Sequence, residues 1–365
     1  MNNKTRIGMM PEVEKWRLPS WASDGLRALS FICALMVVTI HSQSVAGWFR
    51  GDAEWSLPEA LFIILFTDSI SRIAVPFFFF VSGFFLALDY APMHGKYTAL
   101  LKKKLMTVLC PFVVWNMLNV VLMLLTGRLD APCGANALVF CSEKIFGWNP
   151  VVTVGCKQFW YLQCLMLVFI ASPLLTWVAV RLRVAVAGVA ILFCLWCLDV
   201  GKSLPYYLHP KCFLWLMTGM MIAVAAKKRE FRLMERLVSF RGVFLVVFAI
   251  SVAMRVGAGC IRNVVWYGVA DKAVITSGVV VLLLYMQPIS RIVRGLKSCF
   301  KYSFFIYAFH TISISIFALI ASRLSLGVIL EYILCIFFVV TTTLIAACAM
   351  ERFAPKTLRF LCGGR

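Results

Sequence analysis

Apolar runs alternate with short charged or Pro/Gly-containing breaks along the whole chain, and a new run begins about every 35 residues. Each run is close to the ~20 residues that an α-helix needs to cross a bilayer. The pattern therefore predicts an all-α, polytopic transmembrane helix bundle of about ten spans. The predicted spans are residues 27–48, 72–89, 105–126, 158–178, 183–200, 209–226, 241–257, 264–287, 300–322 and 327–349.

One apolar run is too short to fit this scheme. Leu57 to Thr67 covers about eleven residues before the charge of Asp68 interrupts it. A run of this length is shorter than a bilayer crossing and is typical of an interfacial or re-entrant segment. We therefore expect a separate interfacial or re-entrant helix here.

Composition supports the membrane class. The chain is 62% hydrophobic and 14% charged, with a mean hydropathy of +0.90. Residues 1–23 are polar and basic, and no small-residue cleavage pattern follows the first apolar run, so we expect no cleavable signal peptide. The expected organisation is a cytoplasmic N-terminal segment (1–26), an integral membrane domain (27–350) and a cytoplasmic C-terminal tail (351–365).

Basic residues orient the predicted bundle. With a cytoplasmic N-terminus, 25 of the 36 Lys and Arg residues fall on the inner side. The positive-inside rule then places both termini in the cytoplasm, which requires an even number of spans. The net charge of +20 lies in short loops between spans, so we expect anionic lipids and a phosphorylated cytoplasmic ligand as partners, and no nucleic acid. The expected location is the inner (cell) membrane.

Fourteen cysteines do not predict a disulfide framework, because most lie singly within apolar runs. Cys133 and Cys141 share the long loop placed outside, where a bridge is possible. Cys194 and Cys197 form a CxxC motif inside an apolar span, but no second pair completes a zinc site. We therefore expect no metal site.

The candidate chemistry begins in the first span. His41 ends the apolar stretch Leu29–Ile40, and Arg27 precedes it by fourteen residues, or roughly 21 Å along a helix. Ionisable side chains are costly at membrane depth and usually have a function there. His41 is a candidate general base or nucleophile, and Arg27 a candidate anion anchor. Both residues also have a structural reading, His41 as an interhelical hydrogen-bonding group and Arg27 as a positive-inside anchor.

Later segments add further candidates. Lys103 and Lys104 belong to a basic run at the inner end of the third span, where they would anchor the helix or bind a phosphate-rich ligand. Trp160 opens the fourth span as part of an aromatic belt or a sugar-stacking surface. Tyr307 and His310 share one helix face. The Ser82–Gly83 pair favours close approach of another helix.

These segments, in this order, resemble the acyltransferase 3 family of integral membrane acyltransferases, whose members O-acylate glycans and other small acceptors. The resemblance covers roughly residues 20–350. The matching segments are Asp24 to Ala28 with the downstream His41, Val75 to Phe84, the basic run before Pro111, Trp160 to Leu162, Gly219 within Leu216 to Met220, and Ser303 to His310.

The resemblance implies about ten helices and an acyl-coenzyme A donor, used as a co-substrate and not as a permanently bound cofactor. It makes His41 the candidate catalytic histidine and Arg27 its paired arginine. The chain departs from the family pattern at two points. Arg27 lies one helical turn farther from His41 than is usual, and Lys104 and Thr107 stand where two arginines are common.

We therefore expect transfer of an acyl group, with acetyl favoured, from acyl-coenzyme A to a hydroxyl of a cell-envelope glycan or its lipid-linked precursor. His41 would deprotonate that hydroxyl or carry the acyl group, and Arg27 with Lys103 or Lys104 would hold the donor phosphates. The expected acceptor-side residues are Arg72, Trp160, Tyr307 and His310.

The alternative from another class is a multi-pass transporter or flippase of an envelope precursor. Intramembrane histidine and arginine also mark proton and anion paths. However, no paired Gly/Pro-broken helices recur in corresponding halves of the chain, as they do in many transporters.

Overall fold

The computed structural model describes residues 18–48, 56–89, 97–125, 143, 156–200, 204–205, 208–227, 237–261, 263–324 and 326–364. Within these ranges the chain is helical almost throughout and contains no β-strand. The predicted all-α fold is therefore confirmed. Cys133 and Cys141 lie outside the described residues.

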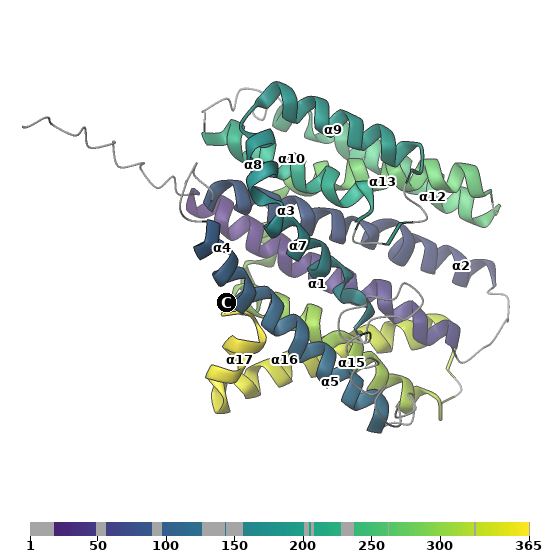
Figure 1. The fold of residues 1–365 in the computed structure, drawn as a ribbon. Helices are drawn as coiled ribbons and strands as arrows, with labels where there is room; N and C mark the ends of the chain where they lie inside the picture. The colour runs from purple at the N-terminus through teal and green to yellow at the C-terminus, as the bar shows by residue number, and fades with distance from the viewer. Residues whose placement is uncertain are drawn as a thin grey trace, which may run out of the picture.

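The helix α1 (Ser20–Trp48) runs through the middle of the bundle (Figure 1). It contacts α3 (Ala74–Asp89), α15 (Ser303–Ala321) and α16 (Val328–Phe353). Its small and aliphatic side chains, Ala28, Leu29 and Cys33 among them, are fully buried. A helix that is apolar on all sides is expected to be surrounded by others, so α1 is the element around which the site is built.

The prediction of a separate interfacial helix at Leu57–Thr67 is wrong. The helix α2 (Leu57–Ile63) continues through a π-helical turn (Ile64–Ile70) and a short 3-10 turn (Ser71–Ile73) into α3. Together they make one apolar stretch, Leu57–Leu88, long enough to span a membrane. Asp68 does not end the helix because Arg72, one turn later, forms an ion pair with it at 2.8 Å.

The remaining helices follow in chain order. They are α4 (Tyr97–Lys104), a π-helical turn (Leu105–Leu109), α5 (Cys110–Leu125), a 3-10 turn (Lys157–Phe159), α7 (Trp160–Ile170), α8 (Ser172–Ala179), α9 (Leu182–Cys197), α10 (Pro210–Lys227), α12 (Arg241–Cys260), α13 (Val264–Leu284), α14 (Met286–Ile292), a 3-10 segment (Val293–Tyr302) and α17 (Pro355–Leu361). Leu358, Leu361 and Cys362 are buried, so α17 packs onto the bundle.

Seven helical stretches among the described residues are long and apolar enough to cross a membrane, and eight if the bent pair α7 and α8 counts as one span. The bend between α7 and α8 is 74°. Two more of the predicted spans correspond to shorter apolar helices, Leu182–Cys197 and Pro210–Ala226. By length and composition the protein is multi-pass, and within the described residues seven or eight of the ten expected spans are long enough to cross a membrane.

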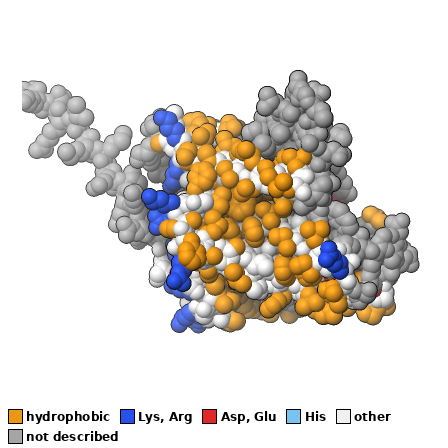
Figure 2. All heavy atoms as spheres, turned by 90° about the horizontal axis from the view of Figure 1, so that it is seen from below, with side chains coloured by type: hydrophobic (Ala, Val, Ile, Leu, Met, Phe, Trp, Pro, Cys, Tyr) orange, Lys and Arg blue, Asp and Glu red, His pale blue; other side chains and the backbone are white. Residues whose placement is uncertain are grey.

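Basic side chains gather at one end of the bundle. This end holds the start of α1, the helix α4 with Lys102, Lys103 and Lys104 in its last turn, and α17 (Figure 1). The ion pair between Lys297 Nζ and Asp24 Oδ2, at 2.7 Å, ties the 3-10 segment to α1 there. Figure 2 shows Lys and Arg side chains along the corresponding edge of a broad apolar face.

The helices α3 and α10 cross at very short range through two glycines. A Cβ atom on Gly83 would overlap the carbonyl oxygen of Leu216, and one on Gly219 would overlap that of Phe80. Small residues let helix backbones approach this closely in membranes. The close approach predicted from Ser82–Gly83 is therefore confirmed.

This crossing yields a stability prediction. Gly219→Ala places a methyl group against a backbone carbonyl that cannot move away, and we expect it to destabilise the protein by roughly 1–3 kcal/mol. Gly188→Ala in α9, where a Cβ meets nothing within 4 Å, should be neutral or slightly stabilising because alanine favours a helix. Thermal unfolding of both purified variants in detergent measures the difference. Equal unfolding temperatures would contradict the packing.

Candidate active site

Two histidines from different helices meet inside the bundle. The ring centroids of His41 on α1 and His310 on α15 lie 5.0 Å apart, with the rings tilted by 40°. His310 is fully buried, whereas His41 is half-buried. The sequence places these residues 269 positions apart, so the fold creates this contact.

Hydrogen bonding fixes the proton position on a neutral His310 ring. Its Nδ1 lies 2.7 Å from the carbonyl oxygen of Tyr307 and 3.3 Å from that of Ile306. A carbonyl can only accept, so Nδ1 must donate, and Nε2 of the neutral ring carries the lone pair. That buried Nε2 has no hydrogen-bond partner among the described residues. His310 thus offers a proton acceptor beside His41.

Tyr307 stands one turn before His310 and is held from several sides. Its hydroxyl donates to the carbonyl oxygen of Gln158 at 2.5 Å. The Gln158 side chain in turn donates from Nε2 to Thr311 Oγ1 at 3.0 Å. The rings of Phe159 and Tyr161 pack against Tyr307, with centroids 5.7 and 6.1 Å away. The start of α7 therefore positions the histidine-bearing face of α15.

Trp160 belongs to the same aromatic wall but at its edge. Its ring packs on Phe79, with centroids 5.9 Å apart. The neighbouring Tyr161 hydroxyl shares a hydrogen bond of 2.7 Å with Ser82 Oγ. These contacts join α7 to α3 beside Tyr307.

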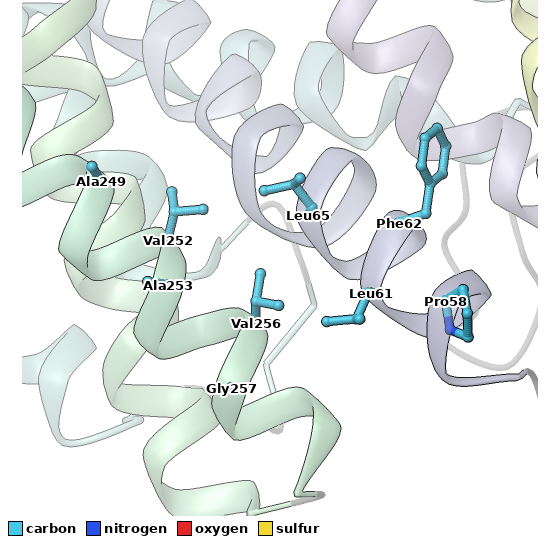
Figure 3. A pocket seen from close by; sticks show the side chains of 9 residues that line it. All are labelled: Pro58, Leu61, Phe62, Leu65, Ala249, Val252, Ala253, Val256 and Gly257. Atoms are coloured by element: carbon cyan, nitrogen blue, oxygen red, sulfur yellow. The ribbon is translucent and has the colours of Figure 1, made fainter.

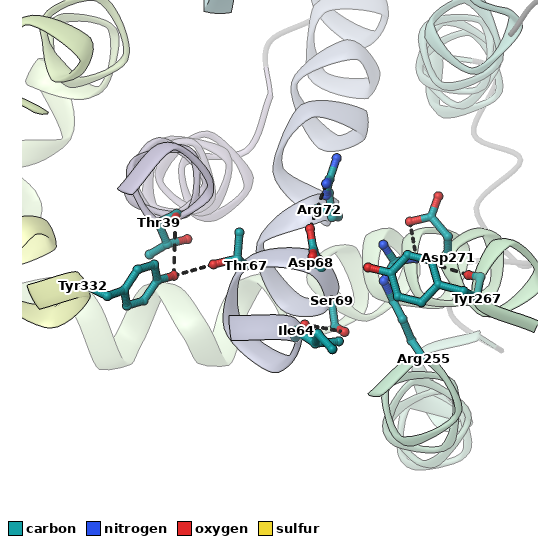
Figure 4. Close-up of polar contacts among 10 residues, drawn as sticks. All are labelled: Thr39, Ile64, Thr67, Asp68, Ser69, Arg72, Arg255, Tyr267, Asp271 and Tyr332. Carbon is teal, nitrogen blue, oxygen red and sulfur yellow. Dashed lines mark hydrogen bonds and ion pairs between the residues drawn. The ribbon is translucent and has the colours of Figure 1, made fainter. Parts of the chain in front are cut away.

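A second set of polar groups surrounds Thr39, two residues before His41 on α1 (Figure 4). Thr39 Oγ1 is hydrogen-bonded to Ser71 Oγ. The Tyr332 hydroxyl bonds to Thr67 Oγ1 at 2.7 Å and donates to the carbonyl oxygen of Thr39 at 3.2 Å. Arg72 follows Ser71 directly, and its charge is near enough to interact with His41.

The predicted donor residues lie far from the histidines. Arg27 is exposed at the basic end of α1, fourteen positions along an unbroken helix from His41, which is roughly 21 Å. Lys103 is exposed on α4. Lys104 Nζ lies 4.6 Å from the centre of the Phe169 ring. Arg27, Lys103 and Lys104 belong to the basic end, and the structure does not bring them to His41.

The structure thus groups the sequence candidates into two places. His41, Tyr307 and His310 form one cluster, with Arg72 nearby and Trp160 on its aromatic border. Sequence reasoning missed Gln158, because a single glutamine at the start of an apolar run carries no distinctive pattern. It also missed Arg255. This residue could have been found, because it is a charged residue inside an apolar run.

The sequence profile of a family described as an acyltransferase domain matches residues 22–350, nearly the whole chain. No curated protein matches the chain, and neither does any solved structure. Among the described residues, no cluster of three or more His, Cys, Asp or Glu side chains could hold a metal ion.

The hydrogen bond of Tyr307 yields a second stability prediction. Tyr307→Phe leaves the Gln158 carbonyl without this donor in a buried place, and we expect a loss of about 1–3 kcal/mol. Tyr285→Phe is the control, because Tyr285 contacts Arg241 through its ring, which phenylalanine keeps. Thermal unfolding in detergent compares the two. An equal shift in both variants would mean that the bond to Gln158 contributes nothing specific.

Proposed function

The chain belongs to the acyltransferase 3 family and is a membrane acyltransferase, and we propose that it moves an acyl group from acyl-coenzyme A to a hydroxyl of a cell-envelope glycan or its lipid-linked precursor. Acetyl is the group we favour. The observation that carries the proposal is the contact between His41 and His310, because it supplies proton acceptors within a bundle whose family transfers acyl groups.

The chemistry needs one proton acceptor and a thioester. The acceptor oxygen forms a bond to the acyl carbon, the carbon–sulfur bond breaks, and the thiolate leaves as coenzyme A. A histidine that takes the hydroxyl proton during attack makes this step faster by about 10²- to 10⁴-fold. That proton can pass to the leaving thiolate, so the histidine is regenerated. In the alternative route His41 first carries the acyl group and then releases it to the hydroxyl.

His310 supports His41 in this proposal. Its Nδ1 is held by backbone carbonyls and its Nε2 is open, the arrangement used by a histidine that acts through Nε2 as a base. The open nitrogen lies on the ring that packs against His41, so one histidine can act on the hydroxyl while the other orients it. Tyr307 keeps the ring in place through its own anchored hydroxyl.

The basic end fits the donor. We place this end in the cytoplasm by the positive-inside rule, where acyl-coenzyme A is found. The phosphates of this donor and its thioester sit at opposite ends of a long flexible arm. Lysines bind phosphate as point charges, so Lys103, Lys104 and Arg27 can hold the phosphates while the thioester reaches His41. The distance between the phosphates and the thioester of the donor then accounts for the distance between Arg27 and His41.

The central test replaces the histidines singly. His41→Ala should lower transfer of radiolabelled acetyl from acetyl-coenzyme A by at least about 10²-fold, and His310→Ala should also lower it, because each removes a ring needed for proton transfer. His209→Ala is the matched control, since His209 lies before α10 and outside the site. The measurement is label bound covalently to envelope glycan in membranes containing each variant. Full labelling by His41→Ala would disprove the assignment, and a protein that only transports its substrate would leave no covalent label.

The donor site has a separate test. The double variant Lys103→Ala with Lys104→Ala should raise KM for acetyl-coenzyme A about 3- to 10-fold with little change in kcat, because two phosphate contacts at the surface are lost. The effect should shrink at high salt, which screens exposed charges. Arg183→Ala removes an exposed positive charge from α9 and should leave KM unchanged. An unchanged KM in the double variant would place the donor phosphates elsewhere.

A further inference from the structure

An apolar groove opens between α2 and α12 (Figure 3). It has a volume of about 810 Å³, and its lining includes Leu61, Leu65, Val252 and Val256. This volume falls in the ~300–1,000 Å³ range of small-molecule sites. The groove is open at its side rather than enclosed, so a long ligand can lie in it and extend beyond it.

Both walls of the groove belong to helical stretches that can span a membrane, Leu57–Leu88 and Arg241–Cys260. Most of α12 faces outward, with Val246 and Ile250 more than half exposed. In a bilayer such a groove is therefore open to lipid and not to water. Its wall side chains are apolar, so the part of a ligand that matches them is a hydrocarbon chain.

A chain of charged groups comes from the same helical stretches as the walls of the groove and from α13 (Figure 4). Asp68, three residues after Leu65, pairs with Arg72 at 2.8 Å, and the Tyr267 side chain lies beside this pair (Figure 4). Arg255, one residue before Val256, stacks over the Tyr267 ring at 4.1 Å and pairs with Asp271 at 2.6 Å. The chain thus joins the wall of the groove to Arg72, which follows Ser71, the hydrogen-bond partner of Thr39 two residues before His41.

Helix packing alone does not account for these charged groups. Arg255 is only 3% exposed, and its Nε has no hydrogen-bond partner among the described residues. Charged side chains inside a membrane bundle are expensive and usually mark a substrate path. Arg72 and Asp271 keep 47% and 33% of their side chains exposed, so both a donor and an acceptor remain within reach of a ligand.

The pairing of charges indicates the chemistry of the head group. Two guanidinium groups and two carboxylates cancel in charge, so a strongly anionic head gains little from them. A sugar hydroxyl both donates and accepts, and it can bond to a carboxylate and a guanidinium together. Tyr267 adds an aromatic face of the kind that packs on sugars.

We propose that the groove between α2 and α12 binds the hydrocarbon chain of a glycolipid acceptor, whose sugar meets the charged groups Asp68, Arg72, Arg255 and Asp271 on its way to His41. The acceptor then enters sideways from the bilayer and is a lipid-linked sugar, not a free or polymeric glycan. That the bound glycolipid is an acyl acceptor rests on the proposed function. The binding of a glycolipid in the groove does not depend on it.

The test is photo-crosslinking of the full-length protein in phosphatidylethanolamine and phosphatidylglycerol vesicles. The probe is a hexadecyl glucoside that carries a diazirine in its chain. We expect labelled peptides from α2 and α12, and excess unlabelled hexadecyl glucoside should compete at least five times better than a lysophosphatidylglycerol of the same chain length. Labelling elsewhere, or equal competition by the phospholipid, would overturn the proposal and make the groove an ordinary lipid contact.

Variants separate binding from folding and from catalysis. Val252→Trp fills the groove and should reduce labelling at least five-fold, whereas Val247→Trp on the same helix, which is exposed outside the groove, should not. Arg72→Gln should keep labelling but remove the preference for the glucoside over the phospholipid. Wild-type labelling in Val252→Trp, or an unchanged preference in Arg72→Gln, would contradict the proposal.

His41→Ala distinguishes this inference from the proposed function. It should keep full labelling while acyl transfer is lost, because the groove lies apart from the histidines. If the wild-type protein is labelled as expected but transfers no acyl group, the proposed function fails and the glycolipid site remains. If it transfers an acyl group but is not labelled in the groove, the glycolipid site fails alone.

Discussion

A polar side chain within a bilayer has no water to bond to, so it must find its partner on another helix. This constraint organises the protein. His41 packs on His310 from α15, and Thr39 is bonded to Ser71 and Tyr332 from two further elements. The polar residues of α1 therefore hold the helices around it in fixed positions. The groups that make the bundle specific are the same groups that make the candidate site.

Ion pairs between neighbouring side chains explain how the chain tolerates charge inside apolar runs. Asp68 has Arg72 one turn away and Tyr267 on another helix, so its charge is matched without breaking the helix. Arg255 is matched in the same way by Asp271. Each charge alone would be expensive at this depth, but a linked set is less so. Such a set also brings the turns between α2 and α3 together with α12 and α13.

How much of this could be predicted from sequence depends on whether a signal is local. Helix class, the close approach at Gly83 and the choice of His41 and His310 as candidates follow from neighbouring residues, and the family was recognisable from short segments in order. The contact between His41 and His310 was not predictable, because nothing in either segment encodes the distance between two helices. The separate helix expected at Leu57–Thr67 failed for a related reason. Asp68 was interpreted as a charge that interrupts the run, and its partners Arg72 and Tyr267 were not considered together with it.

The separation between the basic end and the histidine pair restricts which substrates can bind. Arg27 at the basic end and His41 of the histidine pair lie fourteen positions apart on a continuous helix, so no compact donor can contact both. A donor with charge at one end and a reactive carbon at the other can. The proposed acceptor has to reach the histidines from the side of the bundle, because the histidines lie within it and Arg72 and the groove lie at its side. In the reaction we propose, the donor enters along α1 and the acceptor enters between α2 and α12, so the two reach His41 by different routes. Neither substrate then has to leave before the other can bind.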